Sequence, residues 1–250
     1  MKQVQKLCVN EWKVSHPAWF PLQDIQVHEL PDGGSTENHY HDCHEYYIIV
    51  SGQADILLDN QRFFLHCGDA VAIYCGTRHH IEHAKGPFRY VALQDAPQGA
   101  KRPGRIPAPS MRTFVGTQGR YADGPVIDSE IPRGHSAIVP PRTWFWLKQK
   151  PTWSFLTNLG YINFADGTDE PDYHKHECDE IYLCTAGHMT ALVGGVSYEM
   201  NEGDIIMIPT GVFHRITMAH GDAQLAYFYG ELTGLHRYGH LEDGRDEWVL

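Results

Sequence analysis

The sequence predicts an all-β protein made of two similar barrels in tandem. Short β-rich runs alternate with turns marked by Gly, Asp or Asn, and no long segment has the 3.6-residue period of a helix. The whole pattern also occurs twice. Evenly spaced short strands separated by turns favour an antiparallel sandwich or barrel over alternating strands and helices. A chain of 250 residues is long enough for two modest domains.

The expected strands have the same spacing in both halves. In the first half they cover residues 45–50, 54–58, 62–65 and 70–74. In the second half they cover residues 181–185, 189–193, 196–200 and 205–208. Asp59-Asn60 and Gly194-Gly195 mark equivalent turns between strands. Each half therefore predicts its own antiparallel barrel.

The two halves keep one register, with equivalent residues 135 positions apart: His39 matches His174, Glu45 matches Glu180, and His79 matches His214. Between the halves, residues 95–124 are rich in Pro, Gly and basic residues, which is typical of a connection. We therefore expect an N-terminal barrel over residues 1–100, a linker over 101–125 and a C-terminal barrel over 126–250.

Each half carries three histidines and one glutamate in metal-ligand spacing. The two sets are His39, His41, Glu45 and His79, and His174, His176, Glu180 and His214. Alternation along one strand would place the first three members of each set on the same face. The last His would come from another strand and meet them inside a barrel. Such a set suits Fe, Mn, Ni, Cu or Zn, and an octahedral ion would keep two open positions.

Composition excludes several classes of partner. The net charge of -11 and the absence of a basic stretch argue against binding to nucleic acid. No apolar run reaches membrane-spanning or signal-peptide length. The six cysteines lack Cys-x-x-Cys spacing and are too sparse for a disulfide framework, which fits a reducing compartment. We expect a cytoplasmic protein that binds neither membrane nor nucleic acid.

The motifs around these ligands resemble a known family. The two stretches that carry the resemblance are Gly33-x5-His39-x-His41-x3-Glu45-x6-Gly52 and Gly203-x5-Pro209-x-Gly211-x2-His214. They have the spacing of the first and second cupin motifs, so the chain resembles a two-domain cupin. The resemblance implies a double-stranded β-helix, a jelly-roll-like barrel, in each half, with a divalent transition metal at both sites. Tyr74 replaces the Pro of the second motif, and Gly167 lies one residue too far before His174.

The resemblance and the ligand set imply an enzyme acting on a small oxygen-rich molecule, such as an enediol, a diketone, a keto acid or a sugar-like compound. A dioxygenase is the first expectation. A sugar isomerase or epimerase is the alternative, with Glu45, Glu180 or a nearby Tyr or His moving a proton. Tyr47 and Tyr182 repeat at positions whose parity matches the ligands, and are candidate catalytic residues together with the two glutamates.

A further alternative is a barrel that binds a sugar or metabolite without catalysis. The completeness of both ligand sets argues against it, because a binding module has no evident need for eight intact ligands. Barrels of this family commonly pair edge strands between chains, so a homodimer is one expectation. The alternative is that the two halves protect each other's edges within one chain.

Overall fold

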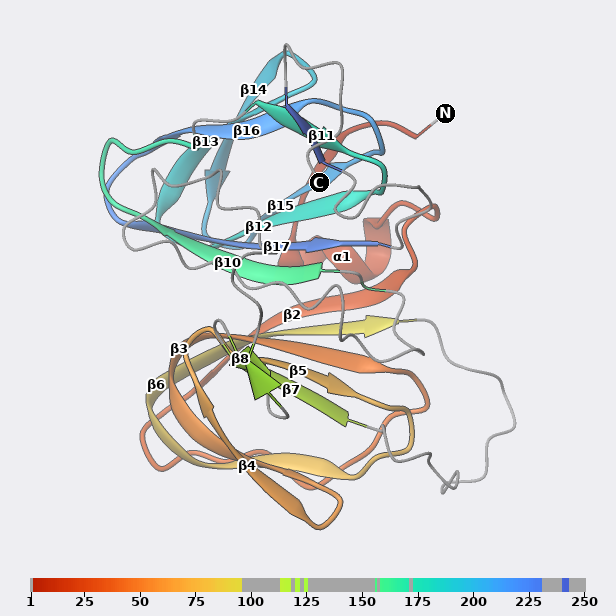
Figure 1. The fold of residues 1–250 in the computed structure, drawn as a ribbon, viewed down its shortest axis with the longest axis vertical. Helices are drawn as coiled ribbons and strands as arrows, with labels where there is room; N and C mark the ends of the chain where they lie inside the picture. Colours follow the sequence, from red (N-terminus) through yellow and green to blue (C-terminus); the bar gives the residue numbers. More distant parts are fainter. Residues whose placement is uncertain are drawn as a thin grey trace. The chain divides into compact units, whose positions relative to one another are not determined.

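The computed structural model describes residues 2–95, 113–117, 120–121, 124–125, 156, 158–170, 173–230 and 240–242. Within these ranges the chain forms eighteen strands and one short helix, and it divides into two compact units (Figure 1). The predicted all-β class is confirmed. No helix in the described ranges is long and apolar enough to cross a membrane.

The first barrel is built around two long, curved strands, β3 and β6 (Figure 1). One sheet has the order β2-β6-β3-β5-β7-β8-β9, and β4 pairs with β3. The two strands expected over 45–50 and 54–58 form one continuous strand, β3. Its pairing with β6 changes register near Gly52, where φ is +74°. The strands of this unit are β2 (Leu22–Leu30), β3 (Glu45–Leu58), β4 (Gln61–His66), β5 (Ala70–Ile73), β6 (His79–Asp95), β7 (Thr113–Thr117), β8 (Arg120–Tyr121) and β9 (Gly124–Pro125).

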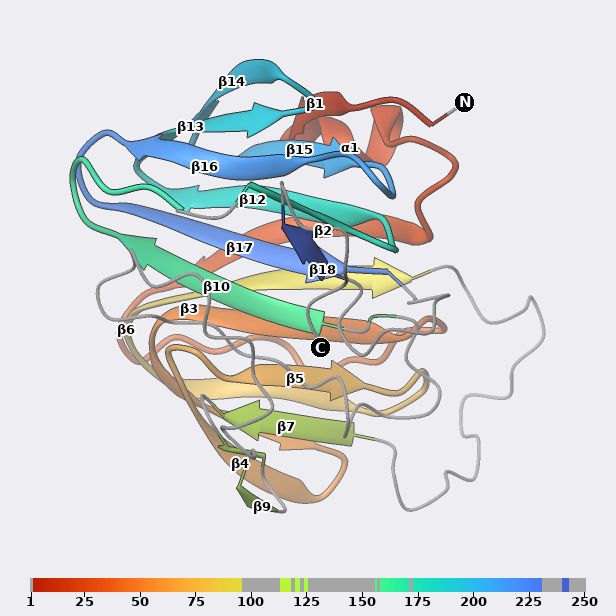
Figure 2. The same cartoon turned by 45° about the horizontal axis from the view of Figure 1, so that its top comes forward.

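The second barrel is split into two five-stranded sheets. One has the order β1-β15-β12-β17-β10, and the other β14-β13-β16-β11-β18; Figure 2 shows β12, β17 and β10 side by side. Its elements are β1 (Gln5–Cys8), α1 (Val9–Ser15), β10 (Asn158–Phe164), β11 (His174–His176), β12 (Glu180–Ala186), β13 (His188–Val193), β14 (Val196–Asn201), β15 (Asp204–Ile208), β16 (His214–Ala219), β17 (Ala223–Tyr229) and β18 (His240–Glu242).

Each barrel has its own apolar core, formed by side chains that alternate along the strands. In β13, Met189, Ala191 and Val193 are buried, whereas the residues between them are partly exposed. The last part of β3 alternates in the same way, with Ile56 and Leu58 inward. This period of two is the pattern expected of a barrel wall with one face on the core and the other on solvent.

The structure differs from the expected domain boundaries in two places. Residues 113–117, placed in the linker, form β7, which pairs with β5 of the first barrel. The run Thr113-Phe-Val-Gly-Thr is β-prone, but its Pro- and Gly-rich neighbours concealed it. Residues 2–20, placed in the N-terminal barrel, belong to the second unit, because β1 pairs with β15.

Candidate metal centres

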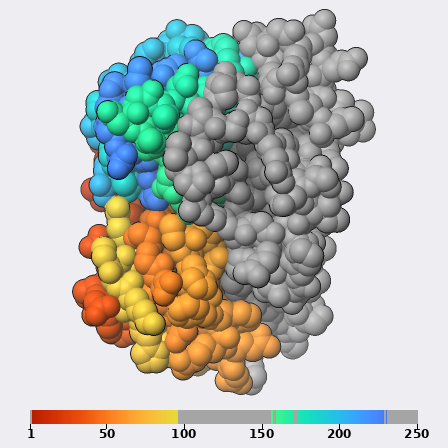
Figure 3. Space-filling model, turned by 60° about the vertical axis from the view of Figure 1, so that its left-hand side comes forward, coloured from red at the N-terminus to blue at the C-terminus, as the bar shows by residue number. Residues whose placement is uncertain are grey.

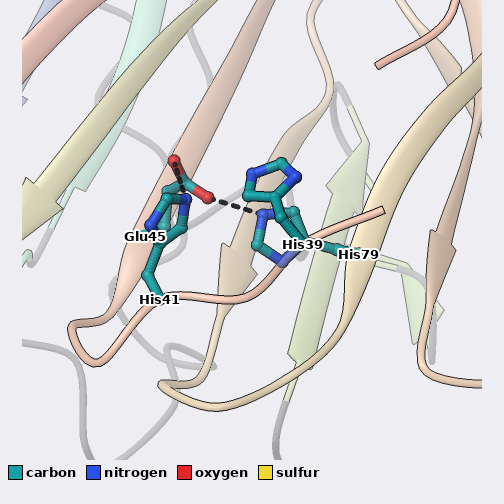
Figure 4. Close-up of side chains that lie close together, drawn as sticks. All are labelled: His39, His41, Glu45 and His79. Atoms are coloured by element: carbon teal, nitrogen blue, oxygen red, sulfur yellow. Dashed lines mark ion pairs between the residues drawn. The ribbon is translucent and has the colours of Figure 1, made fainter. Parts of the chain in front are cut away.

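The first centre gathers four side chains from a loop and two strands of the first barrel (Figure 4). His39 forms an isolated bridge with His79, the first residue of β6, and Glu45 begins β3. Nε2 of His79 lies 2.9 Å from Oε2 of Glu45, and Nε2 of His41 lies 3.6 Å from Oε1. The His39 and His79 ring centroids are 4.3 Å apart.

The second centre repeats this arrangement. His174 pairs with His214 across β11 and β16, and their ring centroids are 4.4 Å apart. Glu180, the first residue of β12, has Oε2 3.2 Å from Nε2 of His176 and 2.6 Å from Nε2 of His214. In each centre one ligand atom from every member lies within 4.8 Å of the others. The structure thus brings together all eight predicted ligands in two sets.

The ligands converge for a different reason from the one expected. Alternation along a single strand cannot place them, because His176 and Glu180 lie on strands of different sheets. In the first centre, residues 42–44 turn the chain between His41 and Glu45. A short turn between the second His and the Glu thus brings the ligands of the first centre together, and in the second centre the ligands come from two different sheets.

Backbone carbonyls set the orientation of three of the imidazoles. Nδ1 lies 2.7 Å from the Glu37 carbonyl oxygen in His39, 2.9 Å from that of Thr77 in His79, and 2.8 Å from that of Val212 in His214. A carbonyl oxygen only accepts hydrogen bonds, so Nδ1 carries the proton in each ring. The Nε2 lone pair is then turned toward the glutamate and is available to a metal.

Burial and charge act together on the two glutamates. Burial of Glu45 favours its neutral form, but the His79 imidazole beside it outweighs this effect and lowers the pKa of Glu45. Burial of Glu180 is likewise outweighed by the charges of His176 and His214, and its pKa is lowered. Burial lowers the pKa of His41 and favours the neutral imidazole, whereas at His214 the charge of Glu180 outweighs burial and raises the pKa. Ionised carboxylates and neutral imidazoles are the forms that bind metals.

The two centres fit a divalent transition metal. Among the described residues, the Nε2 atoms of His79 and His214 are buried and make no hydrogen bond of good geometry, although each lies close to a glutamate oxygen. Buried nitrogens without a hydrogen-bond partner are costly unless another ligand engages them. Three imidazoles and a carboxylate are donors that Fe, Mn, Ni, Cu and Zn accept.

The predicted tyrosines behave differently in the two barrels. The Tyr47 hydroxyl donates to Oε2 of Glu45 at 3.0 Å, so it contacts the first ligand set. Burial, followed by the charge of Glu45, raises the pKa of Tyr47, and the phenol keeps its proton. The Tyr182 hydroxyl instead donates to Oε2 of Glu170 at 3.4 Å. The repeated tyrosines therefore have different partners.

Sequence reasoning missed two residues beside the centres. The Gln94 amide donates to Oε1 of Glu45 at 3.0 Å, and its nitrogen is 3.4 Å from Nε2 of His41. The equivalent residue in the second repeat is Tyr229, so the two repeats differ at this position. Buried Glu170 accepts a hydrogen bond from the backbone N–H of Ile216 at 3.1 Å.

The partner of Glu170 in the first repeat is displaced by one residue. The backbone N–H of Ile81, equivalent to Ile216, donates to the Thr36 hydroxyl at 2.9 Å. Thr36 precedes Glu170 by 134 positions rather than 135, which is the shift already visible at Gly167. A neutral hydroxyl beside the first centre thus corresponds to a carboxylate beside the second.

The centres also differ in exposure. His39 and His41 are partly exposed, and the His41 side chain keeps 31% of its accessible surface. All four members of the second set are buried, with side-chain exposures of 1–2% for His176, Glu180 and His214. Strand β18 pairs with β11 along the residues that carry His174 and His176. A molecule from solvent can therefore reach the first ligand set more easily.

Two antiparallel barrels, each with a set of three histidines and one glutamate that can hold a metal ion, define a tandem-barrel protein with two candidate metal centres. The chain belongs to the Cupin domain family, which it matches over residues 26–93 and 160–229, more than half of its length. The two matched ranges fall in the two repeats. The predicted two-domain cupin is confirmed.

Solved structures share this fold at low sequence identity. Oxalate decarboxylase from Bacillus subtilis is similar with a TM-score of 0.62 and 13% identity, covering 96% of this chain and 74% of that chain. Salicylate 1,2-dioxygenase from Pseudaminobacter salicylatoxidans has a TM-score of 0.53 and 12% identity, covering 88% and 75%. At these identities the likeness shows the fold alone.

One curated relative matches part of the chain. It is the uncharacterized protein y4oW of Sinorhizobium fredii (strain NBRC 101917 / NGR234), which is 36% identical over 80 residues. The match covers 32% of this chain and 37% of the relative, so the two are compared over about a third of their lengths.

Proposed function

We propose that the chain is a metal-dependent dioxygenase that acts on a small oxygen-rich molecule, and that the reaction takes place at the first centre. The observation that carries this proposal is the combination, in one centre, of a complete ligand set and ligands within reach of solvent. The chemistry that bound Fe(II) supplies in such a set is electron transfer between a chelating substrate and dioxygen.

The side chains of the first barrel would position the substrate in several ways. Tyr47 and Gln94 donate to different oxygens of Glu45 and fix the direction of its carboxylate. Partly exposed His41 marks the side from which a small molecule enters. Gln94 is also partly exposed, and its amide nitrogen, which lies 3.4 Å from Nε2 of His41, would help to hold that imidazole beside an incoming substrate.

The second centre supports a structural role better. Its ligands are buried, and they join β11, β12 and β16, which belong to two different sheets. A metal held there would tie these sheets together and contribute its binding free energy to folding. We propose that this centre stabilises the second barrel and does not meet substrate.

The salicylate 1,2-dioxygenase likeness supports oxygen chemistry only by analogy of fold. The surroundings of Tyr47 do not favour proton transfer by its hydroxyl. Its phenol is buried, its hydrogen bond is used on Glu45, and its raised pKa opposes ionisation. The isomerase alternative would therefore need another group to move the proton.

Dioxygen uptake tests the proposal directly. Iron-loaded protein should consume dioxygen with at least one member of a panel of diketones, flavonols and enediols. His79→Ala should abolish uptake, whereas His214→Ala should remove metal from the second centre and leave most of the uptake. No uptake with any substrate would overturn the dioxygenase, and loss of uptake in His214→Ala, with metal retained at the first centre, would overturn the assignment of the reaction.

A further inference from the structure

Outside both barrel interiors, three adjacent strands of the second barrel bring a second kind of cluster to the surface. His188 begins β13, Glu199 lies on β14, and His220 follows β16. The blue and cyan atoms of this barrel form part of the surface in Figure 3. One ligand atom from each of the three residues lies within 4.8 Å of the others. We propose that these residues form a third metal site, specific for a divalent cation such as Zn²⁺.

The three side chains are already aimed at one another. Nε2 of His188 is 2.8 Å from Oε2 of Glu199, and Nε2 of His220 is 3.9 Å from the same oxygen. The two imidazoles are stacked, with ring centroids 4.6 Å apart. Two imidazole nitrogens and a carboxylate oxygen on one side of an ion match the donor preferences of Zn²⁺ and leave a coordination position for water.

The backbone holds this geometry rigidly. His220 N–H donates to the His188 carbonyl at 2.9 Å, so the two histidines are neighbours across antiparallel strands. Thr190, on the same face of β13 as His188, pairs with Glu199 in the ladder and donates to its carboxylate at 3.1 Å. The same hydroxyl oxygen lies 2.8 Å from Nε2 of His220, so Thr190 contacts two of the three residues. His188 and Glu199 lie on strands, which hold ligands more precisely than loops do, and His220 directly follows one.

The Glu199 carboxylate is ready to bind a cation. Its slight desolvation is outweighed by hydrogen bonds from Thr190 and His188, which lower the pKa of Glu199. Among the described residues, the charged groups recorded as facing this carboxylate are His188 and His220, and no Lys or Arg forms an ion pair with it. A metal ion would supply the positive charge that the cluster lacks.

The equivalent positions in the first barrel show which side chains the same fold carries there. The residues equivalent to His188, Glu199 and His220 are Gln53, Phe64 and Lys85. There Lys85 lies over the ring of Phe64, with its nitrogen 5.9 Å from the centroid. The fold thus accepts side chains at these positions that cannot bind a cation, so the cluster is not required to build the barrel.

A second group in the first barrel shows what excludes a metal. Asp55, Glu82 and His83 also lie within ligand distance of one another. Arg62, however, forms ion pairs with both carboxylates, and one of these contacts is 3.0 Å long. The guanidinium already occupies the place of a cation. This group is therefore the matched negative control for the proposed site.

A metal bound by His188, Glu199 and His220 would clamp three strands. Strand β14 lies at the edge of its sheet and pairs with β13. One ion would connect it to β13 and to the end of β16. The expected role is stabilisation of this edge of the second barrel, and it is independent of the reaction proposed at the first centre.

The test counts Zn²⁺ bound per chain by equilibrium dialysis followed by elemental analysis. Wild-type protein should bind one more Zn²⁺ than the double variant His188→Gln/His220→Lys, whose new side chains are those that the first barrel carries. His83→Gln should bind as many as wild type. Thr190→Val should weaken the additional site about tenfold, as expected for loss of a group that orients a ligand.

Thermal unfolding provides a second measurement on the same proteins. Added Zn²⁺ should raise the Tm of wild type and His83→Gln more than that of the double variant. Equal Zn²⁺ counts in wild type and the double variant would overturn the site and leave a hydrogen-bonded surface cluster. The proposed site would also be overturned if His83→Gln bound as little Zn²⁺ as the double variant, because Zn²⁺ binding would then reflect exposed histidines in general.

Discussion

Glu45 and Glu180 are equivalent residues with different surroundings. Two neutral donors, Tyr47 and Gln94, hold the carboxylate of Glu45. Beside the second centre, the Tyr182 hydroxyl is directed to Glu170, a further buried carboxylate. A repeat that keeps its ligands has thus changed the groups around them, and those groups tune the position and basicity of a ligand.

Replacing Tyr47 by Phe should weaken metal binding at the first centre about tenfold, because Glu45 loses a hydrogen bond that orients it. The ring volume is retained, so packing changes little. Tyr182→Phe is the matched control, since its hydroxyl contacts Glu170 rather than a ligand. Metal retention against a competing chelator checks the prediction. If Tyr182→Phe weakens metal binding at the second centre as much as Tyr47→Phe does at the first, the hydrogen bond from Tyr47 to Glu45 is not the cause.

The ligand residues could be predicted from the sequence, because three histidines and a glutamate recur at a constant separation. The way in which the backbone brings them together could not be predicted. The prediction relied on alternation along one strand, and the turn over residues 42–44 interrupts that strand. Gln94 was also out of reach. A single glutamine at the end of a long strand gives no pattern, and only the fold brings it to Glu45.

At the scale of a strand, Gly52 has two separate reasons to be glycine. Its φ is +74°, and a Cβ there would lie 2.7 Å from the Pro87 carbonyl oxygen and 2.8 Å from that of Lys85. Gly76, also in the first barrel, has φ of +80° but no described atom within 4 Å of such a Cβ. The two positions separate backbone strain from close packing of two strands.

Gly76→Ala should lower the free energy of unfolding by about 1–2 kcal/mol, the cost of a left-handed conformation for an L-residue. Gly52→Ala should cost at least about 1–3 kcal/mol more, because two strands must also move apart. Urea denaturation of the metal-loaded variants measures both values. Similar losses for the two variants would mean that β3 and β6 adjust freely at Gly52.

Strand β1 joins the second barrel through its ladder with β15, and helix α1, which follows it, carries Trp12, whose side chain is fully buried. Lys6 of β1 faces Ile206 of β15 in the ladder. Trp12→Ala should destabilise the second barrel by about 3–5 kcal/mol, as for other buried aromatic side chains. Amide hydrogen exchange should then accelerate at Ile205–Met207.

The amides of β5, in the first barrel, provide the control for this variant. Ala70–Ile73 pairs with β3 and β7 and has no ladder with β1. Its exchange should therefore stay close to that of wild type. Equal acceleration in β5 and β15 would show that the two barrels unfold as a single cooperative unit.

At the scale of the whole molecule, the two-barrel fold followed from the repeat and from short strands of regular spacing. The sequence did not predict that residues 2–20 belong to the second barrel, because strand partners far apart in sequence leave no local pattern. The β-prone run at residues 113–117 was concealed by its Pro- and Gly-rich neighbours, although β7 completes a sheet through β5. Local composition thus identified the elements better than their partners.

Removing metal should lower the stability of both barrels. Ions that bind only the folded state stabilise it by about 2.7 kcal/mol when their free concentration is 100 times Kd. Calorimetry before and after chelation should show a lower Tm, restored when metal is returned. His79→Ala/His214→Ala protein should keep only the part of this change that the site at His188, Glu199 and His220 contributes. Chelation that leaves the wild-type Tm unchanged would argue against metal at either centre.

Strand β1 also has a consequence for the order in which the protein is made. Gln5–Cys8 leaves the ribosome almost 200 residues before its partner, Asp204–Ile208, is synthesised. The first barrel can close during translation, whereas β1 keeps unpaired N–H and C=O groups until its partner strand in the second barrel has been made. An N-terminal half released early would thus carry an orphan strand, and a C-terminal half made alone would lack one.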